Sequence, residues 1–108
     1  MKTIIALGSN YNQEENISKA QTLLKQRFKN VKFSDRRWTE PIGITSDKFL
    51  NCIGTLDTEL SLTQVIQCLK EIEQTMGDSH ENHQKGKVLI DIDLAQYGEK
   101  IVKEIIWL

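Results

Sequence analysis

Two aspartates, Asp91 and Asp93, stand two positions apart inside the apolar run KVLIDIDLAQYG (87–98). In a strand, alternate side chains face opposite ways, so both carboxylates would project from one face and the neighbouring aliphatic side chains from the other. At roughly 6–7 Å of strand rise, two bare charges repel each other by about 2–3 kcal/mol at an effective dielectric of about 20. Water, a basic partner or a metal ion must therefore offset this repulsion.

Two interpretations of the aspartate pair remain open at this point. In the first, both acids lie on the solvated face of an antiparallel sheet, which often has one side in water. In the second, they form a magnesium site, because Mg²⁺ favours one or two protein carboxylates together with substrate phosphates. Such a site would neutralise a triphosphate during phosphoryl transfer.

The elements that must position these acids follow from hydrophobic periodicity. Short apolar or alternating runs predict four strands, at 2–8, 31–38, 48–58 and 88–98. Apolar residues at helical spacing predict one helix over about 13–28 and another over about 62–76.

Capping residues mark the ends of these helices. Asn12 followed by Glu15 resembles a capping box, and Ser61 with Gln64 forms a second one. Gly77 suits the position just after the second helix.

The order β-α-β-β-α-β predicts an α+β, ferredoxin-like fold with an antiparallel sheet, both helices on one face and the other face open. Strand alternation would place Phe49 and Asn51 on that open face together with Asp91 and Asp93. An aromatic ring, an amide and two acids on one surface indicate a binding site.

Length and composition narrow the function classes. The chain has 108 residues, which fits one domain, and a net charge of -1, which argues against a broad nucleic-acid surface. No apolar run approaches the roughly 20 residues of a membrane span, and the short N-terminal run lacks the features of a signal peptide. Cys52 and Cys68 form no CxxC pair, so we expect reduced thiols in a cytoplasmic protein.

Taken in order along the chain, several short motifs form a familiar series: IALGSN (5–10), TEPIG (39–43), FLNCIGTLDTELS (49–61), IEQTMG (72–77) and IDIDL (90–94). In this order and spacing, the chain resembles the hydroxymethyl-dihydropterin pyrophosphokinases of the folate pathway. The resemblance implies magnesium-dependent transfer of a pyrophosphoryl group from ATP to the hydroxymethyl group of a dihydropterin, with two Mg²⁺ ions.

The resemblance also implies roles for residues at matching positions. The expected metal ligands are Asp91 and Asp93; the expected pterin-binding residues are Thr39, Ile42, Phe49 and Asn51; and the expected nucleotide-binding residues are Glu73, Lys85 and Lys87. A flat pterin with a donor and acceptor edge suits an aromatic ring combined with an amide.

The chain also departs from the family pattern. Where the family has an arginine-rich segment, this chain has DSHENHQKGKVL (78–89), with Lys85 and Lys87 as the neighbouring cations and Val88 at an arginine position. We expect residues 1–108 to form a single domain that lacks the family's C-terminal segment.

These departures leave three functional predictions. The leading one is the pyrophosphokinase reaction, with a pterin and ATP as small-molecule partners. The second is a catalytically weak or inactive paralogue that binds a pterin or a nucleotide. The third is a module that dimerises through its uncovered sheet face and edges.

Overall fold

The structure is a computed structural model that describes residues 1–40 and 47–107. The predicted pterin residue Ile42 lies outside these described residues. The elements, in chain order, are β1 (Lys2–Ser9), α1 (Gln13–Arg27), β2 (Lys32–Phe33), β3 (Arg37–Thr39), β4 (Phe49–Asp57), α2 (Leu62–Thr75), α3 (His80–Gln84), β5 (Asp91–Tyr97) and β6 (Lys100–Ile101).

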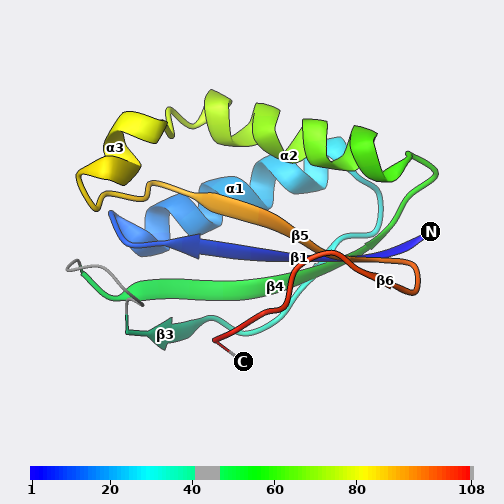
Figure 1. Cartoon of the computed structure of the whole chain (residues 1–108), viewed down its shortest axis with the longest axis horizontal. Helices are drawn as coiled ribbons and strands as arrows, with labels where there is room; N and C mark the ends of the chain where they lie inside the picture. The colour runs from blue at the N-terminus through cyan, green and yellow to red at the C-terminus, as the bar shows by residue number, and fades with distance from the viewer. Residues whose placement is uncertain (41–46, 108) are drawn as a thin grey trace.

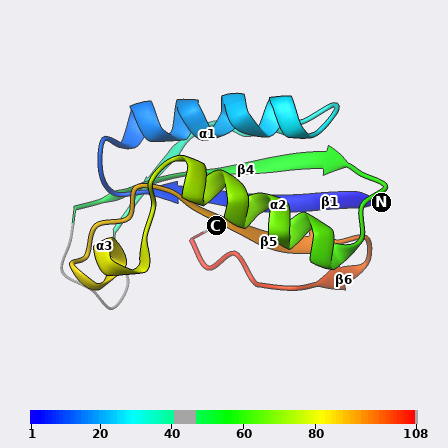
Figure 2. The same ribbon diagram turned by 90° about the horizontal axis from the view of Figure 1, so that it is seen from above.

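All the strands belong to one antiparallel sheet, in the order β2-β4-β1-β5-β6, with β3 also paired to β4. Helices α1 and α2 lie side by side on the same face of this sheet (Figures 1 and 2). The prediction of an α+β fold with an antiparallel sheet and both long helices on one face is therefore confirmed.

The strict βαββαβ layout is wrong, because the described residues form six strands and three helices. The predicted second strand, 31–38, is divided into β2 and β3. The division occurs at Ser34, whose side-chain oxygen takes the place of a backbone carbonyl and accepts the Ile53 N–H at 2.8 Å. The polar segment after Met76 forms the short helix α3, which is capped by Ser79.

The hydrophobic core lies between the two long helices and one face of the sheet. Its strand residues include Ile5, Leu7, Leu50, Cys52, Ile92 and Leu94, and its helix residues include Ile17, Ala20, Leu24, Val65, Leu69 and Ile72. Fully burying a valine, leucine or isoleucine side chain contributes about 1.5–3 kcal/mol. A slip of one residue would exchange Ile92 for a charged aspartate, so this core determines which face carries the acids.

The structure confirms two of the three predicted helix-capping features and contradicts the third. Ser61 and Gln64 form the predicted capping box, and Gly77 has the predicted left-handed backbone, with φ 83°. The box predicted at Asn12 is wrong: this residue adopts a left-handed conformation, with φ 44°, and its side chain makes no cap hydrogen bond. Asparagine tolerates this backbone conformation better than most residues.

The predicted fourth strand begins later than expected, at Asp91, and continues into a hairpin with β6. Gly98 occupies the turn with φ 61°, a conformation that favours glycine. Pairing with β1 changes register between Ile4 and Ile5, which leaves Ala95 as an extra residue in β5.

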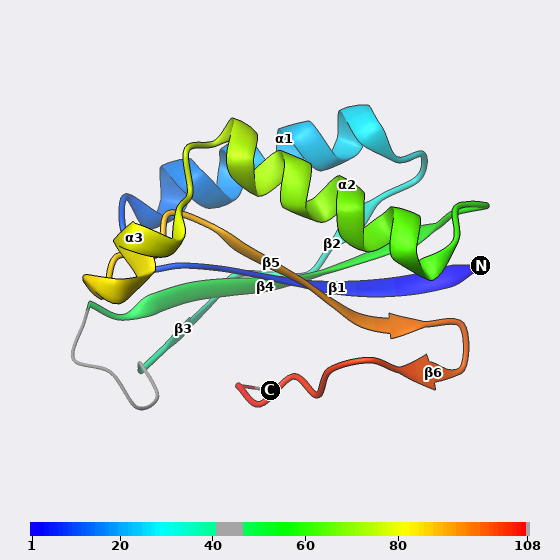
Figure 3. The ribbon, with the colours of Figure 1, turned by 45° about the horizontal axis from the view of Figure 1, so that its top comes forward.

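The Ala95 carbonyl accepts hydrogen bonds from the N–H groups of Val102 (2.9 Å) and Lys103 (3.2 Å). These bonds anchor the C-terminal segment, defined here as residues 103–107, which runs back along the sheet face opposite the helices (Figure 3). The expectation that this face is open is therefore wrong in part, because the C-terminal segment covers some of it.

Both cysteines are free and buried, as the sequence predicted. Among the described residues, no helix has the length and apolar character needed to cross a membrane.

Candidate functional site

Three neighbouring strands place an amide, a glycine and an acid in one row across the sheet. Gly8 in β1 pairs with Asn51 in β4 on one side and with Asp91 in β5 on the other. Directly paired residues of an antiparallel sheet share a face. The amide and the acid, which are far from the glycine in the sequence, are therefore brought to one surface by strand register.

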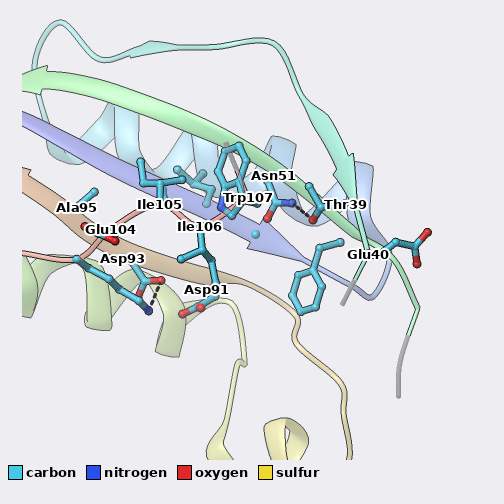
Figure 4. Close-up of a pocket in the computed structure, with 15 residues that line it drawn as sticks. Thr39, Glu40, Asn51, Asp91, Asp93, Ala95, Glu104, Ile105, Ile106 and Trp107 are labelled. Atoms are coloured by element: carbon cyan, nitrogen blue, oxygen red, sulfur yellow. Dashed lines mark hydrogen bonds and ion pairs between the residues drawn. The ribbon is translucent and has the colours of Figure 1, made fainter. Parts of the chain in front are cut away.

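A second row lies beside the first, where Ala6 pairs with Asp93 in β5. Because Gly8 and Ala6 in β1 have little or no side chain, they leave space between the larger side chains of β4 and β5. The result is a cavity of about 290 Å³ on the face opposite the helices (Figure 4), with a lining of Ala6, Leu7, Gly8, Thr39, Glu40, Phe49, Asn51, Asp91, Asp93, Ala95, Lys103, Glu104, Ile105, Ile106 and Trp107. We call it the central cavity.

Gly8 lines the central cavity, a position that its place as the last residue of the expected strand 2–8 does not predict. A Cβ atom at this position would lie 2.8 Å from Asn51 Oδ1 and 3.6 Å from the Phe49 ring. The first separation is too short for nonbonded atoms, so glycine is required for Asn51 to lie where it does.

The Asn51 amide is held in a defined orientation. It is only 4% exposed, and its Nδ2 group donates a 2.6 Å hydrogen bond to Thr39 Oγ1. Thr39 comes from β3, which pairs with the same end of β4. A buried, oriented amide next to a half-buried aromatic ring, Phe49, provides both polar and apolar contacts to a flat ligand.

The two acids on β5 have different environments. Asp93 Oδ2 accepts a 2.9 Å hydrogen bond from the Lys103 ammonium group (Figure 4), and this contact raises the pKa of Lys103. Among the described residues, the Asp91 carboxylate has no such ion pair or side-chain hydrogen bond. Burial, followed by repulsion from Asp93, raises the pKa of Asp91.

A third acid, Glu73 of α2, lies beside the part of β5 that does not pair with β6. Its Oε2 atom accepts a 2.7 Å hydrogen bond from the backbone N–H of Ile92. Burial, with further repulsion from nearby acids including Asp91, raises the pKa of Glu73 to about 7. The strand edge is thus held by a carboxylate that binds a proton more readily than an ordinary glutamate.

Glu73 belongs to a second hollow, of about 420 Å³, on the other side of β5. Its lining consists of Ile66, Leu69, Lys70, Glu73, Asp91, Ile92, Asp93, Leu94, Val102 and Lys103. We call it the edge cavity. Asp91, Asp93 and Lys103 line both cavities, so these three charged residues stand where the two spaces meet.

Two of the predicted nucleotide residues lie away from this junction. Lys85 forms an ion pair with Glu81, 3.6 Å away, and Lys87 lies 4.0 Å from the centre of the Tyr11 ring. Neither is among the described residues that line the two cavities. The basic side chains found there instead are Lys70 and Lys103, which sequence analysis did not select because neither belongs to a recognised motif.

The junction has the charge that a hard cation requires. Two carboxylates face one ammonium group, and Asp91 has no cation of its own among the described residues. No group of three or more His, Cys, Asp or Glu side chains in the described part of the chain is arranged to hold a metal ion. A pair of acids is nonetheless the protein contribution that Mg²⁺ uses when phosphates complete its coordination, so the residues present fit this ion.

Two aspartates stand between two cavities, an arrangement that suits the transfer of a group between two ligands. The family model for 7,8-dihydro-6-hydroxymethylpterin-pyrophosphokinase matches residues 4–107, and the chain belongs to this family. The predicted family resemblance is therefore confirmed. In general, the family comprises folate-pathway pyrophosphokinases that use ATP and Mg²⁺.

A curated relative is the "Folate synthesis bifunctional protein" of Arabidopsis thaliana. It is 33% identical over 107 residues, which cover 95% of this chain and 22% of the relative. The chain thus spans about a fifth of the length of this relative.

Proposed function

We propose that this chain catalyses the transfer of a pyrophosphoryl group from ATP to the hydroxymethyl group of 6-hydroxymethyl-7,8-dihydropterin. The observation that carries the proposal is that Asp91 and Asp93 line both cavities at once. A phosphate held by Mg²⁺ bound to these acids would be within reach of ligands on either side of β5. Membership of the pyrophosphokinase family supports this reaction over other transfers.

The pterin would occupy the central cavity. Phe49 offers a ring face, and Asn51 offers an oriented amide for the hydrogen-bonding edge of the heterocycle. Thr39 would act through Asn51, whose Nδ2 group it holds. Trp107 of the C-terminal segment lines the same cavity (Figure 4) and would supply a second aromatic surface.

The nucleotide would occupy the edge cavity. Ile66 and Leu69 offer apolar contacts there, while Lys70 and Glu73 offer a cation and a hydrogen-bonding acid. In this arrangement the polyphosphate would extend from the edge cavity toward the two aspartates. Lys85 and Lys87, which lie outside this cavity, remain predicted nucleotide contacts only.

Asp91 and Asp93 would hold magnesium, and the family pattern suggests two ions. Bound Mg²⁺ neutralises phosphate charge and orients the transferring group. We assign no general base among the described residues around the central cavity, because Asp91 and Asp93 would be occupied by the metal ion and no role is assigned to Glu40 or Glu104. The contribution of the chain is therefore to bind, align and desolvate the two substrates, effects that can supply a large part of a rate enhancement.

A second candidate function is binding of a pterin or nucleotide without efficient turnover. It is favoured by the composition of the cavities, because no arginine is among the described residues that line them. Lysine lacks the bidentate geometry with which arginine grips a phosphate. Dimerisation through the sheet face is less favoured, because the C-terminal segment lies on that face.

The two main candidates are separated by measuring AMP release from ATP, Mg²⁺ and the hydroxymethyl-dihydropterin. The enzyme proposal expects release by the wild type, its loss in Asp91→Asn, and wild-type release in Asp35→Asn, an exposed acid remote from both cavities. Pterin-dependent NMR shifts that vanish in Asn51→Ala, without AMP release, would instead establish a binding protein. Absence of both would refute the assignment.

A further inference from the structure

Lys103 occupies a special position at the junction of the two cavities. Its ammonium group lies 2.9 Å from Asp93 Oδ2, and its side chain lines both the central and the edge cavity. Among the described residues that line the central cavity, it is the single basic one. The positive charge that pairs with Asp93 is thus the side chain of Lys103.

The backbone of Lys103 is held by hydrogen bonds, whereas its side chain is largely exposed. Its N–H group, together with that of Val102, donates to the Ala95 carbonyl at the irregularity in β5. The Lys103 side chain is 60% exposed, and that of Asp93 is 34% exposed. Exposed ion pairs are weak, so this contact can be broken at low cost while the backbone stays in place.

We propose that Lys103 is a resident counter-ion that a divalent cation must displace from Asp93. An ammonium group and a metal ion cannot both lie against the same carboxylate oxygen without strong mutual repulsion. In the absence of the cation, Lys103 offsets the repulsion between Asp91 and Asp93. In its presence, the Lys103 side chain is released into the junction, where a phosphate would be its nearest new partner.

This inference rests on the proposed function, because it assumes that the two aspartates bind the cation. Its consequence is specific: Lys103 lowers the affinity of the chain for a divalent cation. A residue with a purely structural role would leave that affinity unchanged. Lys103 thus acts through Asp93, as a positioning and regulating residue.

The test is a titration of the whole chain with Mn²⁺ alone. Binding is measured by calorimetry and by the paramagnetic broadening of the backbone amide NMR signals of Asp91–Leu94. Lys103→Met is expected to tighten Mn²⁺ binding about fivefold, which corresponds to about 1 kcal/mol. Lys103→Arg, which keeps the charge, is expected to bind no more tightly than the wild type. Lys100→Met in β6 removes the same charge from an exposed position outside both cavities and serves as the matched control.

Several outcomes would overturn the inference. Equal affinities for the wild type and Lys103→Met, or equal gains in Lys103→Met and Lys100→Met, would show that Lys103 does not compete for Asp93. Weaker binding by Lys103→Met would show that it assists the cation instead. If Asp93→Asn also left Mn²⁺ binding unchanged, or if no variant bound Mn²⁺, the metal site of the proposed function would fail as well.

Discussion

Glu73 Oε2 accepts a hydrogen bond from the backbone N–H of Ile92 at 2.7 Å, which links helix α2 to the part of β5 that does not pair with β6. Ile92 is the residue between Asp91 and Asp93, so this hydrogen bond steadies the backbone that carries both acids. The stabilisation has an electrostatic cost, because burial and the neighbouring acids raise the pKa of Glu73 to about 7. The stability of this part of the site therefore depends on the protonation of Glu73 and hence on pH.

Replacing Glu73 by glutamine should stabilise the fold above neutral pH. The pKa of Glu73 is higher in the folded than in the unfolded chain, so the folded state binds more protons between pH 4.5 and about 7. Stability from this group is therefore complete at low pH and is lost as pH rises through about 7. Glutamine keeps an acceptor for the Ile92 N–H but carries no charge.

Urea unfolding should show Glu73→Gln more stable than the wild type by about 1–2 kcal/mol at pH 8, a value reduced for partial exposure. At pH 5 the two proteins should differ little. Glu71→Gln is the control on the same helix, because Glu71 pairs with Arg27 at the surface and lacks the contact with β5. A stability difference that is the same at both pH values would contradict the prediction.

Adding a methyl group at Gly8 should damage the central cavity. Since a Cβ there would lie 2.8 Å from Asn51 Oδ1, Gly8→Ala must displace the amide. We expect a loss of stability of about 1–3 kcal/mol and pterin binding at least about tenfold weaker, equivalent to about 1.4 kcal/mol.

Gly77→Ala is the matched control for Gly8→Ala. Gly77 has φ 83°, and a Cβ atom added there would meet only open space, so alanine costs about 1–2 kcal/mol through its backbone. Because Gly77 does not line the central cavity, pterin affinity measured by fluorescence or calorimetry should be unchanged. Equal losses of affinity in both variants would indicate general destabilisation rather than displacement of Asn51.

Neutralising Asp91 should affect stability and cation binding in opposite directions. Its raised pKa reflects burial and repulsion from Asp93, so ionised Asp91 disfavours the folded state without a cation. Asp91→Asn should therefore raise stability at pH 7 while weakening Mn²⁺ binding. Thermal unfolding with and without Mn²⁺ measures both effects.

Asp93→Asn provides the comparison, because it removes the partner of Lys103. It should weaken Mn²⁺ binding without the gain in stability. If Asp91→Asn were destabilising without metal, the unpaired, repelled character assigned to this carboxylate would be wrong.

Thr39 should matter through the hydrogen bond that it accepts from Asn51. In Thr39→Val the Asn51 Nδ2 group loses its 2.6 Å partner, and its remaining contact, to the Arg37 carbonyl, is 3.5 Å long. We expect a loss of about 1–3 kcal/mol for the buried donor and weaker pterin binding. Thr39→Ser retains the hydroxyl and should bind the pterin as the wild type does. Weaker pterin binding by Thr39→Ser would show that the threonine methyl group, and not the hydrogen bond, is what matters.

The sequence by itself determined the faces of the strands and the periodic parts of the helices. Alternation in 49–57 and 91–97 separates Leu50 and Ile92, which are buried in the core, from Phe49 and Asp91, which line the cavity. This pattern is local, and the large free energy of burying apolar side chains enforces it. The capping box at Ser61 was also correctly predicted, because it is local and depends only on residues three positions apart.

Only the tertiary structure decided how these faces are completed. The position of Gly8 between Asn51 and Asp91 depends on the register of three strands, and the Glu73–Ile92 bond depends on how α2 packs. Lys103 reaches Asp93 because an irregularity in β5 exposes the Ala95 carbonyl to the returning chain. Contacts of this kind join residues through space by single hydrogen bonds, and they leave no periodic pattern in the sequence from which they could be predicted.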